Sequence, residues 1–187
     1  MEPAISSLMA ATDRGDGRAA EALFEAIHSE LQRTKRELAR EAGPGVTVGV
    51  TSLLHEAYRV VSAESGASLP DRARFMRHAA RVVRGLVIEH ARQRKVRERS
   101  GQFEITLLEV EIAAGAVDPE ELTQIGDALD ELAKIEPALA EIVDLKVFCG
   151  FSLAEIAVMR RVSEPMAKRS WEKARLYLHR SIRTTPA

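Results

Sequence analysis

The stretch RARFMRHAARVVRGLVIEHARQRKVRERSG, residues 72–101, decides the fold. Within it, residues recur at the i, i+4, i+7, i+11 spacing that gathers side chains on one side of an α-helix. These residues are Phe75, Ala79, Val82, Leu86 and His90. The spacing predicts one long helix with a buried side, provided that Gly85 does not interrupt it.

The other side of this helix is strongly basic. Residues 72–99 hold ten Arg or Lys against Glu89 and Glu98. At ~100° per residue, one side collects a set that we call the basic ridge, roughly 40 Å long. The ridge comprises Arg77, Arg81, Arg84, Arg92, Lys95 and Arg99. A solvated helix face is the plain alternative, but such a face normally mixes acids with bases, and Arg is a good phosphate ligand. The ridge therefore indicates a contact with nucleic acid.

Before the ridge, the pattern predicts two further helices. Residues 16–41 form a long amphipathic repeat that ends at Gly43-Pro44-Gly45, and residues 51–61 form a shorter one. A turn-rich loop follows at 62–70. Together with the basic helix, these segments predict an N-terminal helical domain over residues 1–100.

Residues 101–120 differ in character from the rest of the chain. Acids alternate with apolar residues from Phe103 to Ile112, and small residues and Asp118-Pro119 follow. We interpret this segment as an acidic linker, although the alternation could also support a short strand.

The C-terminal segment, 121–187, is predicted to be helical again. Helices are expected at 121–136 and from Pro137 to Gly150. Ser152 is expected to cap a short helix, and Ser163 a last helix that runs to about Ile182. That last helix has a core stripe of Ala167, Trp171, Ala174 and Leu178. A short helix, a tight turn and a long helix are typical of a helix-turn-helix.

Basic residues surround that turn. A recognition helix needs basic and polar groups near its N-terminal end, where it enters the major groove of DNA. The candidates for DNA contact here are Arg160, Arg161, Lys168, Arg169 and Lys173.

Composition narrows the class of protein. Of 187 residues, 45% are apolar and only 4% aromatic, which favours an all-α fold of two small domains over a sandwich or barrel. The single Cys149 excludes an internal disulfide and fits a reducing cytoplasm. The sequence has no zinc-site spacing, nucleophile motif or phosphate-binding loop, so we expect no enzyme, metal or cofactor. No signal peptide or membrane span is expected.

Charge is distributed in blocks. The formal charge is −1 overall, but it is +4 over residues 1–103, −10 over 104–148 and +5 over 149–187. Because charge acts within a Debye length of ~8–10 Å, two basic ends can bind a polyanion that the acidic middle repels.

The combined pattern resembles a bacterial RNA polymerase sigma factor of the two-domain, extracytoplasmic-function (ECF) type. Residues 51–61 (TSLLHEAYRVV) and 72–101 resemble the second half of the family's region 2. Residues 128–182 resemble its region 4. The resemblance implies that region 2 binds the clamp of core polymerase and the −10 promoter element, and that region 4 binds the flap and the −35 element.

The resemblance also assigns roles to residues. Arg77, Arg81, Arg84, Arg92 and Lys95 would contact −10 DNA, and the loop 62–70 would hold an unstacked base. Arg160, Arg161, Lys168, Arg169 and Lys173 would contact −35 DNA, with Lys168 or Arg169 as the base contact. Leu53, Leu54, Glu56 and Tyr58 would bind core polymerase. An anti-sigma factor is a further expected partner.

Three departures from the family pattern bear on these roles. Arg160-Arg161 replaces the usual Leu-Gly of the turn, and Met166 replaces a small hydroxyl residue. The clamp-binding stretch 51–56 has one carboxylate, Glu56, where many relatives have an acidic run. Phosphorylation of Thr51 or Ser52 by a Ser/Thr kinase would restore negative charge there. The alternative is a clamp contact made mainly by apolar residues.

Two other functions stay open at this point. One is a helix-turn-helix regulator that acts without polymerase and needs a dimer to read two half-sites. The other is a helical protein that binds polymerase or an anti-sigma factor without initiating transcription.

Overall fold

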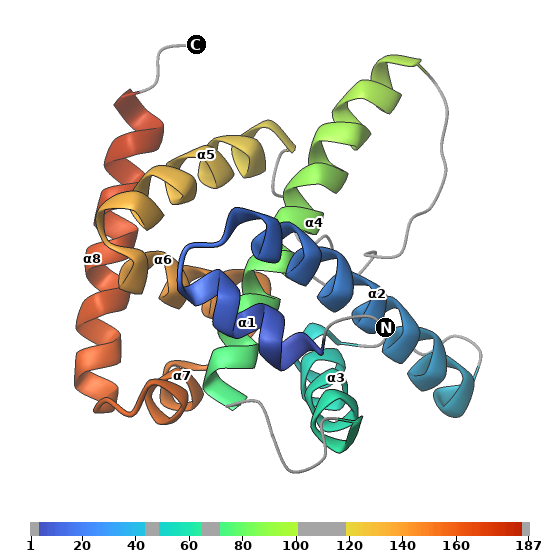
Figure 1. Cartoon of the computed structure of the whole chain (residues 1–187). Coiled ribbons are helices and arrows are strands. Elements are labelled where there is room, and N and C mark those ends of the chain that lie inside the picture. Colours follow the sequence, from blue (N-terminus) through green and yellow to red (C-terminus); the bar gives the residue numbers. More distant parts are fainter. Residues whose placement is uncertain (1–3, 44–48, 65–71, 101–118, 185–187) are drawn as a thin grey trace. The chain divides into compact units, whose positions relative to one another are not determined.

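The computed structural model describes residues 4–43, 49–64, 72–100 and 119–184, and every regular element in these ranges is a helix (Figure 1). The all-α prediction is therefore confirmed. The contacts divide the chain into two compact units, Met1–Val82 and Val83–Ala187. Most of the expected linker (101–118) and most of the base-holding loop predicted at 62–70 (65–70) lie outside the described residues. The remaining residues correct the prediction, because 62–64 belong to helix α3 and 119–120 to helix α5. The domain boundaries drawn from the sequence stay a prediction.

The first unit contains α1 (Ile5–Asp13), α2 (Gly17–Ala42), α3 (Val50–Glu64) and the beginning of α4 (Arg72–Ser100). The start of α2 is fixed because the Asp16 carboxylate accepts hydrogen bonds from the backbone N–H groups of Arg18 and Ala19 at 3.0 and 3.1 Å. Its end is fixed by Gly43, whose φ of 84° stops the helix. The core of this unit includes Met9, Leu23, Ile27, Leu54 and Phe75.

The basic helix α4 passes through Gly85 without a break, as the spacing predicts. Its buried side is broader than the single predicted stripe, since Met76, Ala80 and Val83 are also buried and Leu86 is only half-buried. A wide apolar side is typical of a helix that packs against several others. Less of the circumference of α4 is consequently left for exposed cations.

The second unit contains the rest of α4, α5 (Pro119–Ile135), α6 (Pro137–Val143), the π-helical turn η2 (Asp144–Phe148), α7 (Leu153–Arg160) and α8 (Glu164–Thr184). The helix predicted from Pro137 thus ends in a π-helical turn before Gly150, which has a φ of 75°. The largest buried side chains of this unit are Leu129, Leu132, Ile142, Leu145, Phe148, Phe151 and Ile156.

Cys149 lies in this core and is 1% exposed. Burial, with the nearby Asp144 charge, raises the pKa of its thiol, so the reactive thiolate is disfavoured.

Among the described helices, none combines the length and the apolar character that crossing a membrane would require.

Candidate nucleic-acid interface

At the N-terminal end of α4, Asp13 binds two arginines and a histidine at once. Its carboxylate accepts from Arg74 Nε at 2.6 Å and lies 3.4 Å from Arg77 Nη2 and 3.0 Å from His78 Nε2. Asp13 is the last residue of α1, so this cluster ties α1 to α4. Arg77, a predicted DNA contact, is therefore partly neutralised.

The titration of this cluster reflects burial and charge. Burial lowers the pKa of His78, which is 4% exposed, and this effect outweighs the opposing attraction of Asp13. His78 therefore favours its neutral form, with the proton on Nε2 where it can donate to Asp13. Partial burial would raise the pKa of Asp13, but the hydrogen bond from Arg74 and the charges of His78 and Arg77 hold it below its usual value.

Further along α4, Arg84 is not an exposed member of the ridge, which corrects the sequence prediction. Its side chain is 12% exposed, and its guanidinium lies 3.1 Å from both Asp144 of η2 and Asp130 of α5. The Asp144 side chain is only 2% exposed. The sequence did not show this pairing because Asp144 lies 60 residues further along the chain.

The remaining ridge residues differ in exposure. Arg81 is exposed, and Arg92, which is 50% exposed, lies 3.3 Å from Asp127 of α5. The side chain of Lys95 lies outside the described residues, although its backbone belongs to α4. Of the predicted −10 contacts whose side chains the structure describes, Arg81 and Arg92 are the most exposed.

At the C-terminus, α7 and α8 occupy the residues predicted for the helix-turn-helix. α7 begins with a capping box, in which the Ser152 hydroxyl accepts from the Glu155 backbone N–H and the Glu155 carboxylate accepts from the Ser152 N–H. The Ser163 hydroxyl similarly accepts from the Met166 N–H at 3.3 Å near the start of α8. Both predicted serine caps are confirmed.

The turn between these helices depends on Arg161. Its φ of 54° and ψ of 42° are left-handed, a conformation that usually takes glycine. The backbone N–H of Arg161 donates to Val158 at 3.2 Å and that of Val162 to Ala157 at 3.0 Å, which is the hydrogen-bond pattern of a Schellman motif. An arginine therefore adopts a backbone geometry to which glycine is better suited.

The predicted −35 contacts fall into two groups. Arg161, Lys168 and Arg169 are exposed around the turn and the first half of α8. Arg160 instead lies 3.7 Å from Glu141, and Lys173 lies 2.6 Å from Glu136. Met166, which lies near this first group, is 53% exposed.

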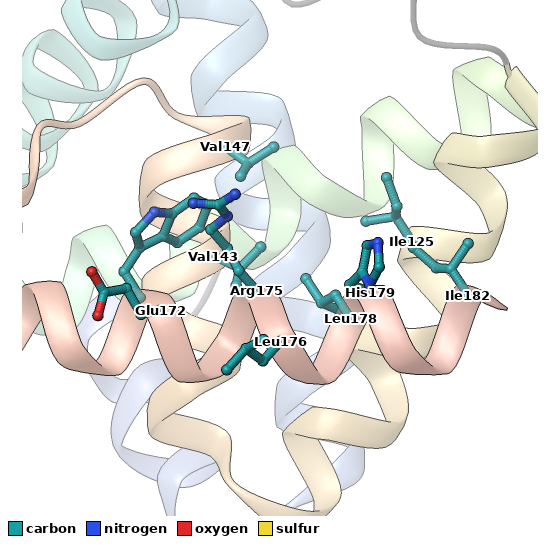
Figure 2. Close-up of a pocket in the computed structure, with 10 residues that line it drawn as sticks. Ile125, Val143, Val147, Glu172, Arg175, Leu176, Leu178, His179 and Ile182 are labelled. Atoms are coloured by element: carbon teal, nitrogen blue, oxygen red, sulfur yellow. The ribbon is translucent and has the colours of Figure 1, made fainter. Parts of the chain in front are cut away.

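An open apolar groove of about 710 Å³ lies along α8 and was not predicted from the sequence. Figure 2 shows Leu178, His179 and Ile182 of α8 near Ile125 of α5. Val143, Val147 and Trp171 also line it. Trp171, assigned from the sequence to the core, is half-buried, and its ring lies 5.5 Å from Lys146 Nζ and 5.9 Å from Arg175 Cζ.

The predicted polymerase contacts on α3 are only partly accessible. Leu53 and Leu54 are 4% and 0% exposed, so they belong to the core and their side chains are not available to a partner, which corrects that expectation. Glu56 is half-buried and bound to the exposed Arg59, with 3.0 Å between Nε and each carboxylate oxygen. The half-buried Tyr58 packs its ring against Phe75 at 5.6 Å.

A protein-family model described as ECF sigma factor matches residues 2–184, nearly the whole chain. The chain belongs to the ECF sigma factor family. Sigma factors of this family act in transcription initiation without being enzymes, and they bind core RNA polymerase and promoter DNA, often under the control of anti-sigma factors. No curated protein and no solved structure matches the chain.

Proposed function

We propose that this ECF sigma factor directs promoter-specific initiation by reading a −35 duplex with α8 and a −10 element with α4. The observation that carries the proposal is the group of exposed cations around the α7–α8 turn, Arg161, Lys168 and Arg169. They lie near the N-terminal end of a helix 21 residues long, where a recognition helix meets base edges and phosphates.

The −10 role rests on α4. Arg81 and Arg92 are exposed, lie on the same predicted side of the helix and suit phosphate binding. Arg84 joins them only if its ion pairs with Asp130 and Asp144 open. Substitutions of Arg81 and Arg92 therefore test DNA binding more directly. Truncation of Arg84 would also leave Asp144 buried without this partner, which would destabilise the fold.

The groove beside Trp171 is proposed to take apolar side chains of the polymerase flap. Val147 and Leu176 are 41% and 59% exposed at this groove, and contiguous exposed apolar surface commonly marks a protein contact. Val147→Arg should weaken core-polymerase binding at least tenfold. Val158→Arg is the matched control, because Val158 is 79% exposed on α7 and does not line the groove.

On α3, Ser52 and Thr51 occupy the first turn, where the helix dipole favours a phosphate. Ser52 is exposed and Thr51 is half-buried, which makes Ser52 the better kinase substrate. In this part of the proposal, phosphorylation adds charge for the clamp next to Glu56, which Arg59 neutralises. Equal polymerase affinity of the unmodified and the stoichiometrically phosphorylated chain would exclude it.

Run-off transcription with purified core polymerase and a promoter library tests the main proposal. Initiation at specific promoters supports it. Tight duplex binding without polymerase would favour an independent regulator, and polymerase or anti-sigma binding without initiation would favour a decoy.

The −35 contact is tested by Arg169→Ala in the assembled holoenzyme. If Arg169 binds a base edge, its loss should weaken promoter binding by about 1–3 kcal/mol and relax sequence preference at one position of the −35 element. Arg18→Ala, which removes an exposed cation from α2, is the control and should change neither. Unchanged promoter affinity in Arg169→Ala would remove this residue from the interface.

A further inference from the structure

The turn between α7 and α8 carries a serine that follows two arginines. The sequence there is Arg160-Arg161-Val162-Ser163, and Ser163 is exposed. Arginines two and three residues before a serine are what a Ser/Thr kinase with an acidic substrate-binding surface selects, because each guanidinium pairs with a carboxylate of the kinase. This stretch therefore has the charge pattern of a kinase substrate.

A second serine in the same pair of helices provides a comparison. Ser152 is also exposed, and its hydroxyl accepts from a backbone N–H at the start of α7 as that of Ser163 does at the start of α8. The three residues before Ser152 are Cys149-Gly150-Phe151, which carry no charge at neutral pH. The two serines thus share exposure and local geometry and differ in the arginines that precede them.

We propose that Ser163 is a phosphorylation site for an arginine-directed Ser/Thr kinase, and that its phosphate prevents α8 from binding the −35 duplex. The inference rests on the proposed −35 role of α8. In the transfer, Ser163 Oγ forms a bond to the γ-phosphorus of the ATP that the kinase holds, the bond from this phosphorus to the β–γ bridging oxygen breaks, and ADP leaves. The hydroxyl proton passes to the catalytic aspartate of the kinase.

The geometry of the turn leaves the hydroxyl accessible to this reaction. Ser163 Oγ accepts from the Met166 N–H at 3.3 Å, which occupies one of its two lone pairs. Arg160 lies 3.7 Å from Glu141, and Arg161 is exposed. The φ of 54° at Arg161 is strained for a residue with a side chain, so less free energy is needed to open this turn into the extended form that a kinase binds.

A phosphate at Ser163 would change the charge that the turn presents to DNA. Arg161, Lys168 and Arg169 are exposed around this position and are the proposed −35 contacts. A phosphate adds about −1.5 to −2 of charge near pH 7 and three acceptor oxygens. It therefore competes with the phosphates of DNA for these cations and repels the DNA backbone.

The fold is expected to tolerate this modification. Ser163 directly precedes α8, where the first backbone N–H groups of a helix lack helical partners and the helix dipole favours negative charge. A phosphate can accept from the Met166 N–H that the hydroxyl binds in the unmodified chain. The phosphorylated chain should consequently remain folded and lose only DNA affinity.

The first test places phosphoserine at position 163 of the full chain by genetic encoding and assembles the holoenzyme. Promoter affinity should fall at least about tenfold, and the salt dependence of binding should decrease by about two phosphate contacts, while core-polymerase affinity stays the same. The control carries phosphoserine at position 29, because Ser29 is exposed in α2 and the added charge is equal. Equal promoter affinities of the two phosphorylated chains, or a parallel loss of core-polymerase affinity at position 163, would overturn the proposal.

The second test concerns the modification itself. A purified Ser/Thr kinase that selects arginines two and three residues before its serine, supplied with MgATP, should modify Ser163 in the full chain and leave Ser152 unmodified, as read by mass spectrometry. Arg161→Gln should slow the transfer several-fold. Ser163→Asn is the control that should abolish it, since asparagine caps a helix as serine does but has no hydroxyl. Absence of phosphate at Ser163, or equal modification of Ser152, would overturn the assignment.

These outcomes separate the inference from the proposed function. An unmodified holoenzyme that initiates at specific promoters, together with a phosphorylated one that binds them equally well, would contradict only the inference. Failure of the unmodified holoenzyme to initiate at any promoter would contradict the proposed function and the switch with it, while mass spectrometry would still decide whether Ser163 is the modified residue.

Discussion

The two Arg-rich helices, α4 and α8, present their charge in opposite ways. On α4, several basic side chains form ion pairs with acidic ones: Asp13 binds Arg74 and Arg77, and Asp144 binds Arg84. On α8, Lys168 and Arg169 are exposed at the end of the helix next to the turn. The number of basic residues in a helix therefore does not by itself determine how much positive charge the helix exposes.

The physical origin of this difference is the position of the acids. Those that bind α4 lie 35 to 65 residues away along the chain, on other helices. Near α8, Arg160 and Lys173 bind Glu141 and Glu136. The first half of α8 thus keeps the charge that the sequence suggests, whereas α4 keeps only part of it.

Among substitutions that compare the ion pairs of α4 and α8, the largest effect on stability is expected at Asp144. Asp144→Asn should lower the free energy of unfolding by about 3 kcal/mol, because it leaves a mostly buried guanidinium with only the exposed Asp130 as its carboxylate partner. Urea unfolding monitored by the fluorescence of the single Trp171 measures this change. Lys173→Gln removes an exposed pair of α8 and should cost less than about 1 kcal/mol. Equal losses of unfolding free energy in the two variants would mean that burial does not make the Arg84–Asp144 pair more important for stability than the Lys173–Glu136 pair.

A smaller change is expected at the α7–α8 turn. Arg161→Gly should raise the free energy of unfolding by about 1 kcal/mol, because glycine adopts positive φ without the strain of a side chain. The same variant should bind promoter DNA more weakly at every sequence and reduce the salt dependence by about one phosphate contact. Chemical denaturation and a salt titration of holoenzyme binding measure the two effects. Arg161→Ala should lose the DNA contact without gaining stability.

The smallest effect concerns the Asp13 cluster and pH. Because the pKa of His78 is lower in the folded chain than in the unfolded one, the unfolded chain binds its proton more readily, and stability should fall as pH drops below ~6.5. The lowered pKa of Asp13 acts in the same direction at still lower pH, since its stabilisation is present above ~3.8 and is lost as pH falls further. Unfolding between pH 7 and 5 should show this slope in the wild type and a shallower one in His78→Gln. Identical slopes would exclude His78 as the titrating group.

Much of the fold followed from local patterns. The spacing of apolar residues predicts α2 correctly, and the caps Ser152 and Ser163 predict α7 and α8 correctly. α1 was missed, because nine residues with few large apolar side chains give little periodic signal. Helix existence is a local property, so it can be derived from a single sequence.

The candidate interface was less predictable, because it depends on long-range contacts. The burial of Leu53 and Leu54 and the pairing of Arg84 are set by other helices, whose positions the local pattern does not specify. Exposure of Arg169 was foreseeable from its position opposite the buried Ala167 and Ala174, and that of Lys168 from its position beside Arg169. Conversely, the groove beside Trp171 needs four elements to form, α5, α6, η2 and α8, which explains why a single helical stripe gave no sign of it.

The π-helical turn η2 has a consequence for how this sequence tolerates insertions and deletions. Its wider turn lets Asp144, Leu145 and Phe148 all be buried before the chain reverses at Gly150. Removing one residue from 144–148 would rotate the buried side chains that follow by about 100° relative to α6. A surface loop tolerates such a deletion, but here it would move Phe148 and Cys149 out of their buried positions. We therefore expect insertions and deletions in this segment to be less tolerated than substitutions of any one of its residues.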